Sequence, residues 1–122
     1  MTKIRVATLG LAAVAVLAWA WPAGAQTGNV KATTIVVAAG KPSEFKFKLS
    51  KLTAPKGVVV FKVTNSGAIV HDFKIGTKKT RLLSPGASQL LRVTFTKAGR
   101  FQFMCTVTGH AVAGMKGTLT VK

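Results

Sequence analysis

Reactive side chains are scarce in this 122-residue chain, which has one cysteine, two histidines, two acidic residues and no tyrosine. With a single cysteine no internal disulfide can form, so a folded domain must rely on its own apolar core. A lone thiol is also a liability in an oxidising compartment unless it is buried or bound to metal. The two acids, Glu44 and Asp72, stand against 18 basic residues and leave a formal net charge of +16.

The basic residues are scattered rather than gathered in blocks, and Lys46 and Lys48, for example, alternate with apolar residues. One interpretation is a set of solvated strand faces, and the other is electrostatic steering toward an acidic partner. A nucleic-acid partner is not expected, because no tyrosine interleaves with the basic residues and both tryptophans, Trp19 and Trp21, lie near the N-terminus. Weak association with an anionic membrane surface is compatible with the charge.

The first 25 residues have the pattern of a signal peptide. A short positive region precedes an almost entirely apolar run, and Ala23-Gly24-Ala25 has the small-x-small form of a signal-peptidase site. We predict a signal peptide over 1–25 and a mature domain over 26–122, exported to the periplasm or another extracytoplasmic space. The alternative is an uncleaved membrane tether, but the run from Val6 to Trp21 has 16 residues, at or below the ~17 that span a bilayer.

The pattern after the leader predicts about seven to eight short strands in one domain. Apolar residues alternate with polar ones, turn residues separate the segments, and no helical periodicity is present. These features are typical of an all-β sandwich. We expect a hairpin turn at 97–99 and place Phe45, Phe47 and Leu49 on one strand face. The strands are expected at 30–38, 44–49, 58–64, 72–75, 88–96, 100–105 and 116–121.

The only cysteine and both histidines of the chain fall into one pattern. Cys105, His110 and Met115 follow one another with four residues in each gap, and His71 lies 34 residues before Cys105. One thiolate, two imidazoles and a weak axial thioether form the trigonal site of blue-copper electron-transfer proteins. We therefore predict one type 1 copper ion, with His71, Cys105, His110 and Met115 as its metal ligands.

Other interpretations of these residues stay open at this point. Met104 is a competing thioether, although its position next to Cys105 on a strand should point it to the opposite face. Zinc is a competing metal, although structural zinc sites usually have more thiolates or a harder fourth ligand. Taken singly, Cys105 and Met115 are also ordinary core residues, and His71 and His110 are ordinary surface residues.

The chain resembles the cupredoxins, small blue copper proteins that include plastocyanin and auracyanin. The resemblance is carried by residues 65–73, by 84–86, by 98–105 and by the loop from Gly109 to Gly117. It implies a Greek-key β-sandwich with copper near one end. It also implies that a ring edge of His110 reaches the surface through an apolar patch, the alternative being plain loop packing. Candidates for the patch are Ile69, Val70, Pro85, Ala111, Val112 and Ala113.

Two positions depart from the pattern of many relatives. Asp72 stands where they carry an asparagine that ties the two ligand loops together. We predict that Asp72 accepts a hydrogen bond from the backbone or hydroxyl of Thr106, and that its charge favours Cu(II). The alternative is a carboxylate that faces solvent. Met104 stands where many relatives have tyrosine, so the aromatic side chain at that position is missing.

These residues predict an exported carrier that shuttles single electrons between redox proteins by Cu(I)/Cu(II) cycling. Its partners would have acidic docking surfaces, for example a cytochrome or an oxidoreductase, and a monomer is expected. The alternative is a non-redox copper-binding protein for copper delivery, storage or tolerance. Catalysis is not expected, because a catalytic copper centre would need further histidines and both are used at one site.

Overall fold

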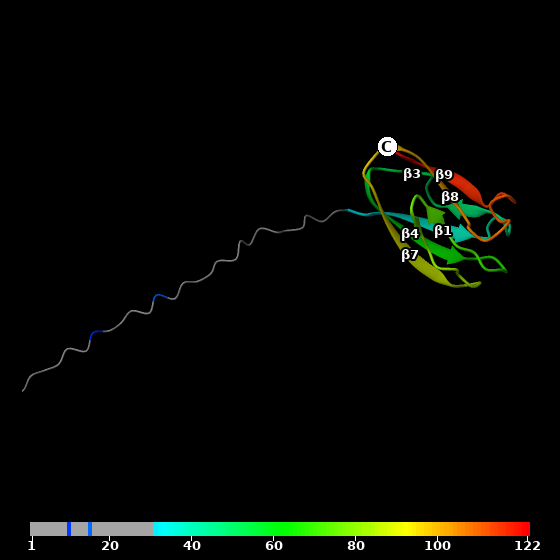
Figure 1. Ribbon diagram of the computed structural model, residues 1–122, viewed down its shortest axis with the longest axis horizontal. Coiled ribbons are helices and arrows are strands. Elements are labelled where there is room, and N and C mark those ends of the chain that lie inside the picture. Colours follow the sequence, from blue (N-terminus) through cyan, green and yellow to red (C-terminus); the bar gives the residue numbers. More distant parts are fainter. Residues whose placement is uncertain (1–9, 11–14, 16–30) are drawn as a thin grey trace, which may run out of the picture.

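The computed structural model describes Gly10, Ala15 and residues 31–122, so the predicted leader lies almost wholly outside the described residues. From residue 31 to 122 the chain forms nine strands in two sheets that lie face to face (Figure 1). No helix in this part of the chain is long and apolar enough to cross a membrane. The predicted all-β, Greek-key sandwich is confirmed, with nine strands instead of seven or eight.

The first sheet has the strand order β2-β1-β4-β7. It consists of β1 (Thr33–Ala39), β2 (Phe47–Leu49), β4 (Gly57–Asn65) and β7 (Ser88–Phe95). β1 runs parallel to β4, whereas its pairing with β2 and the pairing of β4 with β7 are antiparallel. The parallel pair places Ala39 opposite Asn65, so β1 and β4 end side by side and the segments that follow them start at the same end of the sandwich.

The second sheet has the order β3-β9-β8-β5-β6. Its strands are β3 (Thr53–Ala54), β5 (Lys74–Ile75), β6 (Lys78–Lys79), β8 (Gly99–Met104) and β9 (Lys116–Val121). β8 and β9 are antiparallel, with Met104 opposite Lys116. The predicted ligand loop therefore leaves the sheet from β8 and re-enters it at β9, at one end of the sandwich.

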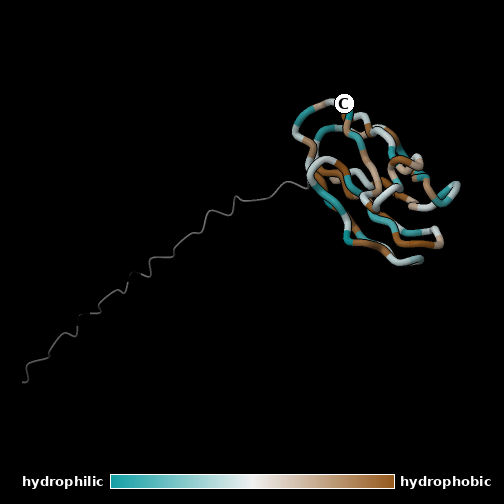
Figure 2. The backbone as a smooth tube through the Cα atoms, turned by 45° about the vertical axis from the view of Figure 1, so that its right-hand side comes forward, coloured by the Kyte–Doolittle hydropathy of each residue, from teal (hydrophilic) through white to brown (hydrophobic). Residues whose placement is uncertain are grey.

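The core lies between the two sheets and follows the period-2 alternation of the strands. Val59, Phe61 and Val63 alternate along β4 and have no exposed surface. Hydrophobic and hydrophilic segments alternate along the tube in Figure 2. Full burial of each large apolar side chain contributes about 1.5–3 kcal/mol. A single main cluster of fifteen buried apolar residues can therefore hold the domain without a disulfide.

Two local predictions were wrong. The strand expected at 44–49 begins only at Phe47, because Lys46 N–H donates to the Ser43 carbonyl at 3.1 Å and closes a turn. Phe45 therefore does not share a buried face with Phe47 and is 37% exposed. The segment 97–99 is not a hairpin turn, because β7 and β8 belong to different sheets. The short strands β3 and β6 were not predicted at all.

Candidate metal site

The side chains of His71, Cys105 and His110 meet at one end of the sandwich, and all three are buried. The Nδ1 atoms of the two histidines are 3.2 Å apart. Cys105 Sγ lies 3.5 Å from His110 Nδ1 and 4.0 Å from His71 Nδ1. The fold thus brings the donor atoms of three of the four predicted metal ligands close together.

These separations fit a single transition-metal ion. Bonds of about 2.0–2.1 Å to nitrogen and about 2.3 Å to sulfur, as in zinc sites, put two donors about 3.1–4.0 Å apart at bond angles of roughly 100–135°. The chemistry of the donors favours copper, because a thiolate is a soft ligand that suits Cu(I) and imidazole also suits Cu(II). The residues present therefore fit a copper ion.

Cys105 follows directly on β8 and points into the molecule on the same side as Phe103. Its side chain is buried, and its N–H donates to the Met115 carbonyl at 3.1 Å. Burial raises the pKa of the Cys105 thiol, and the backbone N–H groups of Asp72 and Val107, which point at the sulfur, oppose that rise. The same two donors would stabilise a metal-bound thiolate and tune its potential.

The loop between β8 and β9 is a compact run of turns that aims His110. His110 N–H donates to the Val107 carbonyl, and Met115 N–H donates to the His110 carbonyl, both at 3.0 Å. Gly109 (φ 84°) and Gly114 (φ 113°) adopt backbone conformations that other residues rarely adopt. These two glycines allow the chain to turn back on itself within the short gap between Cys105 and Met115.

His110 is largely buried, with 8% of the residue exposed. The ring of Phe45 meets it edge-on, with centroids 5.0 Å apart and planes at 72°. Burial lowers the pKa of the His110 imidazole, and the nearby charge of His71 adds to that effect. Five of the six residues expected in the apolar patch are exposed and Ala111 is half-buried; the exposed ones are Ile69, Val70, Pro85, Val112 and Ala113. The neutral imidazole that these surroundings favour is the form that binds metals.

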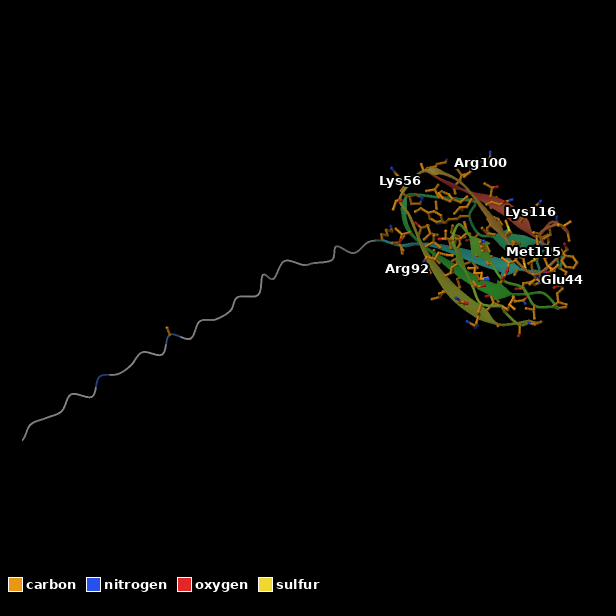
Figure 3. All side chains as sticks on the ribbon, viewed as in Figure 1. Glu44, Lys56, Arg92, Arg100, Met115 and Lys116 are labelled. Carbon is orange, nitrogen blue, oxygen red and sulfur yellow. The ribbon has the colours of Figure 1, made fainter. Side chains whose placement is uncertain are left out.

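Met115 is fully buried and belongs to a small cluster with Cys105 and Ala39. Met104 is paired across the sheet with Lys74 and Lys116, on the face opposite to Cys105. Strand alternation therefore places the Met115 side chain beside the cysteine and turns that of Met104 away, as predicted. Figure 3 shows Met115 at the same end of the sandwich as Glu44.

The loop that carries His71 is fixed by backbone and side-chain hydrogen bonds. His71 N–H donates to the Leu83 carbonyl at 3.2 Å, and Leu83 N–H donates to the His71 carbonyl at 2.7 Å. The Asn65 side-chain amide, fully buried, donates to the Ile69 and Leu83 carbonyls at 2.7 Å each. Its Oδ1 accepts from Gly67 N–H at 2.9 Å. A fully satisfied buried amide of this kind makes a loop rigid.

Asp72 ties the two ligand loops together, as predicted. Its Oδ1 accepts from the Thr106 backbone N–H at 2.6 Å, and its Oδ2 accepts from the Thr106 hydroxyl. The side chain is buried, so the alternative of a solvent-facing carboxylate was wrong. The residue after each of two predicted ligands, His71 and Cys105, thus contributes to one link between their loops.

Glu44 is a site residue that the sequence analysis missed. Its Oε1 lies 2.7 Å from His71 Nε2, the ring nitrogen that does not face Cys105. The backbone N–H groups of Ala68 and Ile69 donate to the carboxylate at 2.9 and 3.2 Å. These donors hold the pKa of the Glu44 carboxyl below its usual value. No local pattern marks Glu44, because it is 27 positions from His71 and the two meet only through tertiary packing.

Comparison with known proteins gives relatives that are named copper-resistant cuproprotein CopI or cytochrome c oxidase subunit 2. The chain is 31% identical over 99 residues to the copper-resistant cuproprotein CopI of Rubrivivax gelatinosus, covering 63% of this chain and 60% of that protein. It is 33% identical over 109 residues to cytochrome c oxidase subunit 2 of Thermus thermophilus, covering 85% of this chain and 77% of that subunit. The match spans 23% of the length of the CopI protein of Pseudomonas aeruginosa and 60% of that of Rubrivivax gelatinosus, less than two thirds of either.

Among solved structures, rusticyanin from Thiobacillus ferrooxidans superposes with a TM-score of 0.63 at 24% identity, covering 75% of this chain and 78% of that chain. At this identity the likeness concerns the fold alone. The family model described as a cupredoxin-like domain matches residues 10–121. Together with the buried His-Cys-His cluster, this match shows that the chain belongs to the cupredoxin-like domain family and that its cofactor is a single copper ion.

Proposed function

We propose that this protein carries single electrons on one type 1 copper ion bound by His71, Cys105, His110 and Met115. The observation that supports the proposal most is the convergence of two imidazole nitrogens and one thiol sulfur, all buried and within 4.8 Å of one another. One thiolate and two imidazoles beside a weak thioether are the ligand set of blue-copper electron carriers. When bound, copper supplies the Cu(I)/Cu(II) couple.

The chain's own residues are suited to keeping such a site unchanged during electron transfer. Cys105 lies at the end of a strand, His71 lies in a loop bridged to Leu83, and turns fix His110. Asp72 joins the His71 and Cys105 loops. Because these supports are hydrogen-bonded and buried, little has to move when the charge of the site changes, and that favours fast transfer.

The proposal includes export to the periplasm or another extracytoplasmic space. It is supported by the positive, apolar and small-residue regions within the first 25 residues. An exported protein with one cysteine needs that thiol protected from oxidation, and Cys105 is buried. Mass spectrometry of the protein from its own host would test this, since an N-terminus at Gln26 is expected and an intact Met1 in membranes would contradict it.

We also propose that the redox partners dock through acidic surfaces. Both acids of the chain accept hydrogen bonds beside the site, so the rest of the surface has no carboxylate side chain to offset the basic residues. Three lysines follow one another across the second sheet, because Lys79 on β6 pairs with Lys74 on β5, and Met104 on β8 pairs with both Lys74 and Lys116 on β9. We call Lys74, Lys79 and Lys116 the lysine row. Like charges placed directly opposite each other on a sheet are destabilising. Lys74 and Lys79 form such a pair, and an acidic partner would relieve their repulsion.

A second candidate function is copper tolerance without electron transfer. It is favoured by the similarity to CopI, which is named a copper-resistant cuproprotein. The two functions differ in what copper does once bound. A carrier should show fast reversible voltammetry and slow copper loss, whereas a delivery protein should pass copper to a chelator or acceptor quickly. We propose no enzymatic activity, because the chain has no histidine beyond the two at this site.

The visible and electron-paramagnetic spectra of the Cu(II)-loaded protein test the main proposal. An intense thiolate-to-copper charge-transfer band is expected, and it should be lost in Cys105→Ser. The matched control is Met104→Leu, because Met104 lies on the opposite strand face and should not affect the band. A colourless protein that binds zinc or no metal would contradict the electron-carrier function.

A further inference from the structure

Glu44 lies in the segment that joins β1 to β2 and yet contacts the site from the side opposite to the cysteine. Its side chain is 29% exposed, while the His71 side chain that it touches is completely buried. The carboxylate is also anchored, because the N–H groups of Ala68 and Ile69 donate to it. Because two backbone N–H groups and the ring of His71 all contact the carboxylate, it has one orientation relative to the imidazole.

That orientation determines which nitrogen of His71 carries the proton. A carboxylate only accepts hydrogen bonds, so the 2.7 Å contact requires a proton on Nε2. In the neutral ring Nδ1 then has a free lone pair, and Nδ1 is the atom that faces His110 Nδ1 and Cys105 Sγ. The contact therefore selects the tautomer that can bind metal through Nδ1.

The backbone around Glu44 is shaped to allow this contact. A Cβ on Gly67 would overlap Glu44 Oε1 and would lie 3.0 Å from His71 Nε2. A Cβ on Gly40 would lie 2.5 Å from the Cα of Gly67, so the two loops approach backbone to backbone. Glycine at both positions leaves just enough room for the carboxylate to reach the ring.

We infer that Glu44 is a positioning residue for the copper site, which fixes the tautomer and ring orientation of His71. The inference rests on the proposed role of His71 as a ligand. Carboxylates bonded to the outer nitrogen of a ligating histidine raise its basicity, and their loss typically weakens metal binding by about 10–100-fold. Glu44 therefore strengthens copper binding and favours the oxidised ion.

Two variants separate positioning from charge. Glu44→Gln keeps the shape and removes the charge, whereas Gly67→Ala keeps the charge and displaces the carboxylate from the ring. Copper affinity is measured by competition with a chromophoric chelator, and exchange of the His71 Nε2–H proton is followed by ¹⁵N NMR of the Cu(I) protein. Ser43→Ala, an exposed neighbour on the same segment, is the control and should leave both readouts unchanged.

We expect both variants to bind copper about 10–100-fold more weakly and to exchange the Nε2 proton faster than the wild type. The inference is overturned if both variants stay within twofold of the wild type, or if only one of them weakens binding. An effect of Glu44→Gln alone would indicate charge without positioning, and an effect of Gly67→Ala alone would indicate a direct clash with His71. A wild type without the charge-transfer band would instead contradict the proposed function.

Discussion

Both negatively charged side chains of this protein, Glu44 and Asp72, lie at the candidate copper site. Glu44 accepts from the ring of His71, and Asp72 accepts from Thr106 in the other ligand loop. No other acidic side chain exists in the chain, against 18 basic ones. Because Coulomb attraction favours the more positive oxidation state of a bound ion, two carboxylates near the site should stabilise Cu(II) in an otherwise cationic molecule.

The Asp72 charge should therefore lower the reduction potential. Asp72→Asn is expected to raise the potential by roughly 100 mV, the size of one unit charge acting over about 7 Å at an effective dielectric constant near 20. Direct voltammetry of the copper protein measures the shift. Thr106→Val is the control, since it removes the hydroxyl bond and keeps the carboxylate charge. Equal shifts in both variants, or no shift in Asp72→Asn, would contradict the electrostatic explanation.

The buried imidazole and thiol make the stability of the metal-free protein depend on pH. Burial lowers the pKa of His110 below its ordinary 6.5, so the unfolded chain binds that proton more readily and stability falls as pH drops below about 6.5. Burial raises the pKa of Cys105 above its ordinary 9.0, so the unfolded chain loses that proton first and stability falls as pH rises above about 9.

Urea unfolding of the metal-free protein from pH 5 to 10 checks both signs, and the highest stability is expected between the two limits. His110→Gln should flatten the acidic side, and Cys105→Ser should flatten the alkaline side. A loss of stability that persists on either side in the matching variant would mean that another group causes it.

At the scale of elements, the connection between β1 and β2 supports both histidines. Gly40 N–H donates to the Lys46 carbonyl at 2.9 Å and closes this segment into a tight loop. Glu44 and Phe45, which are consecutive, contact His71 and His110 respectively. One short connection outside the two ligand loops thus touches both imidazoles.

Phe45 should shield His110 from water. Phe45→Ala is expected to open the ring to solvent, and the potential should fall because water stabilises the more charged Cu(II) state. Copper dissociation should also become several-fold faster. Voltammetry and chelator-driven copper loss measure the two effects, and Phe45→Leu, which keeps an apolar cover, should restore most of the wild-type behaviour. An unchanged potential in Phe45→Ala would show that the aromatic contact does not control access.

Sequence patterns predicted the candidate ligands, three of which meet in the structure, better than the residues that support them. Cys105, His110 and Met115 lie on one connection between two strands, so their spacing alone places them together. Asn65 and Glu44 act through the parallel register of β1 and β4, which no local pattern encodes. The alternation of phenylalanine and lysine at 44–49 also suggested a strand, but a turn begins there and directs Phe45 to His110 instead.

On the scale of the whole molecule, the candidate copper site and Lys31 lie at opposite ends of the sandwich. β1 begins two residues after Lys31 and ends at Ala39, which packs with Cys105 and Met115. Seven residues of strand extend roughly 23 Å. Lys31 and Lys122 line one hollow at the far end. A leader kept as a tether would therefore leave the copper end directed away from its attachment point.

This separation allows the charge of the docking face, which is the surface around the lysine row, to be distinguished from the total charge of the protein. Lys74→Glu with Lys116→Glu reverses charge in the lysine row, beside the site. Lys51→Glu with Lys56→Glu makes the same change in net charge near the far end, where Figure 3 shows Lys56 well away from Met115 and Lys116. Stopped-flow electron transfer with an acidic redox protein, followed over a range of ionic strength, compares the two variants.

The first pair should slow transfer by more than tenfold at low salt and remove most of its salt dependence, because steering acts through the charges nearest the docking face. The second pair should slow transfer much less. Equal slowing in both pairs would mean that only the net charge attracts the partner, and the lysine row would then be an ordinary solvated sheet face. Rates that do not depend on salt even in the wild type would remove the steering argument altogether, and the alternation of lysines along the strands would need no explanation beyond solubility.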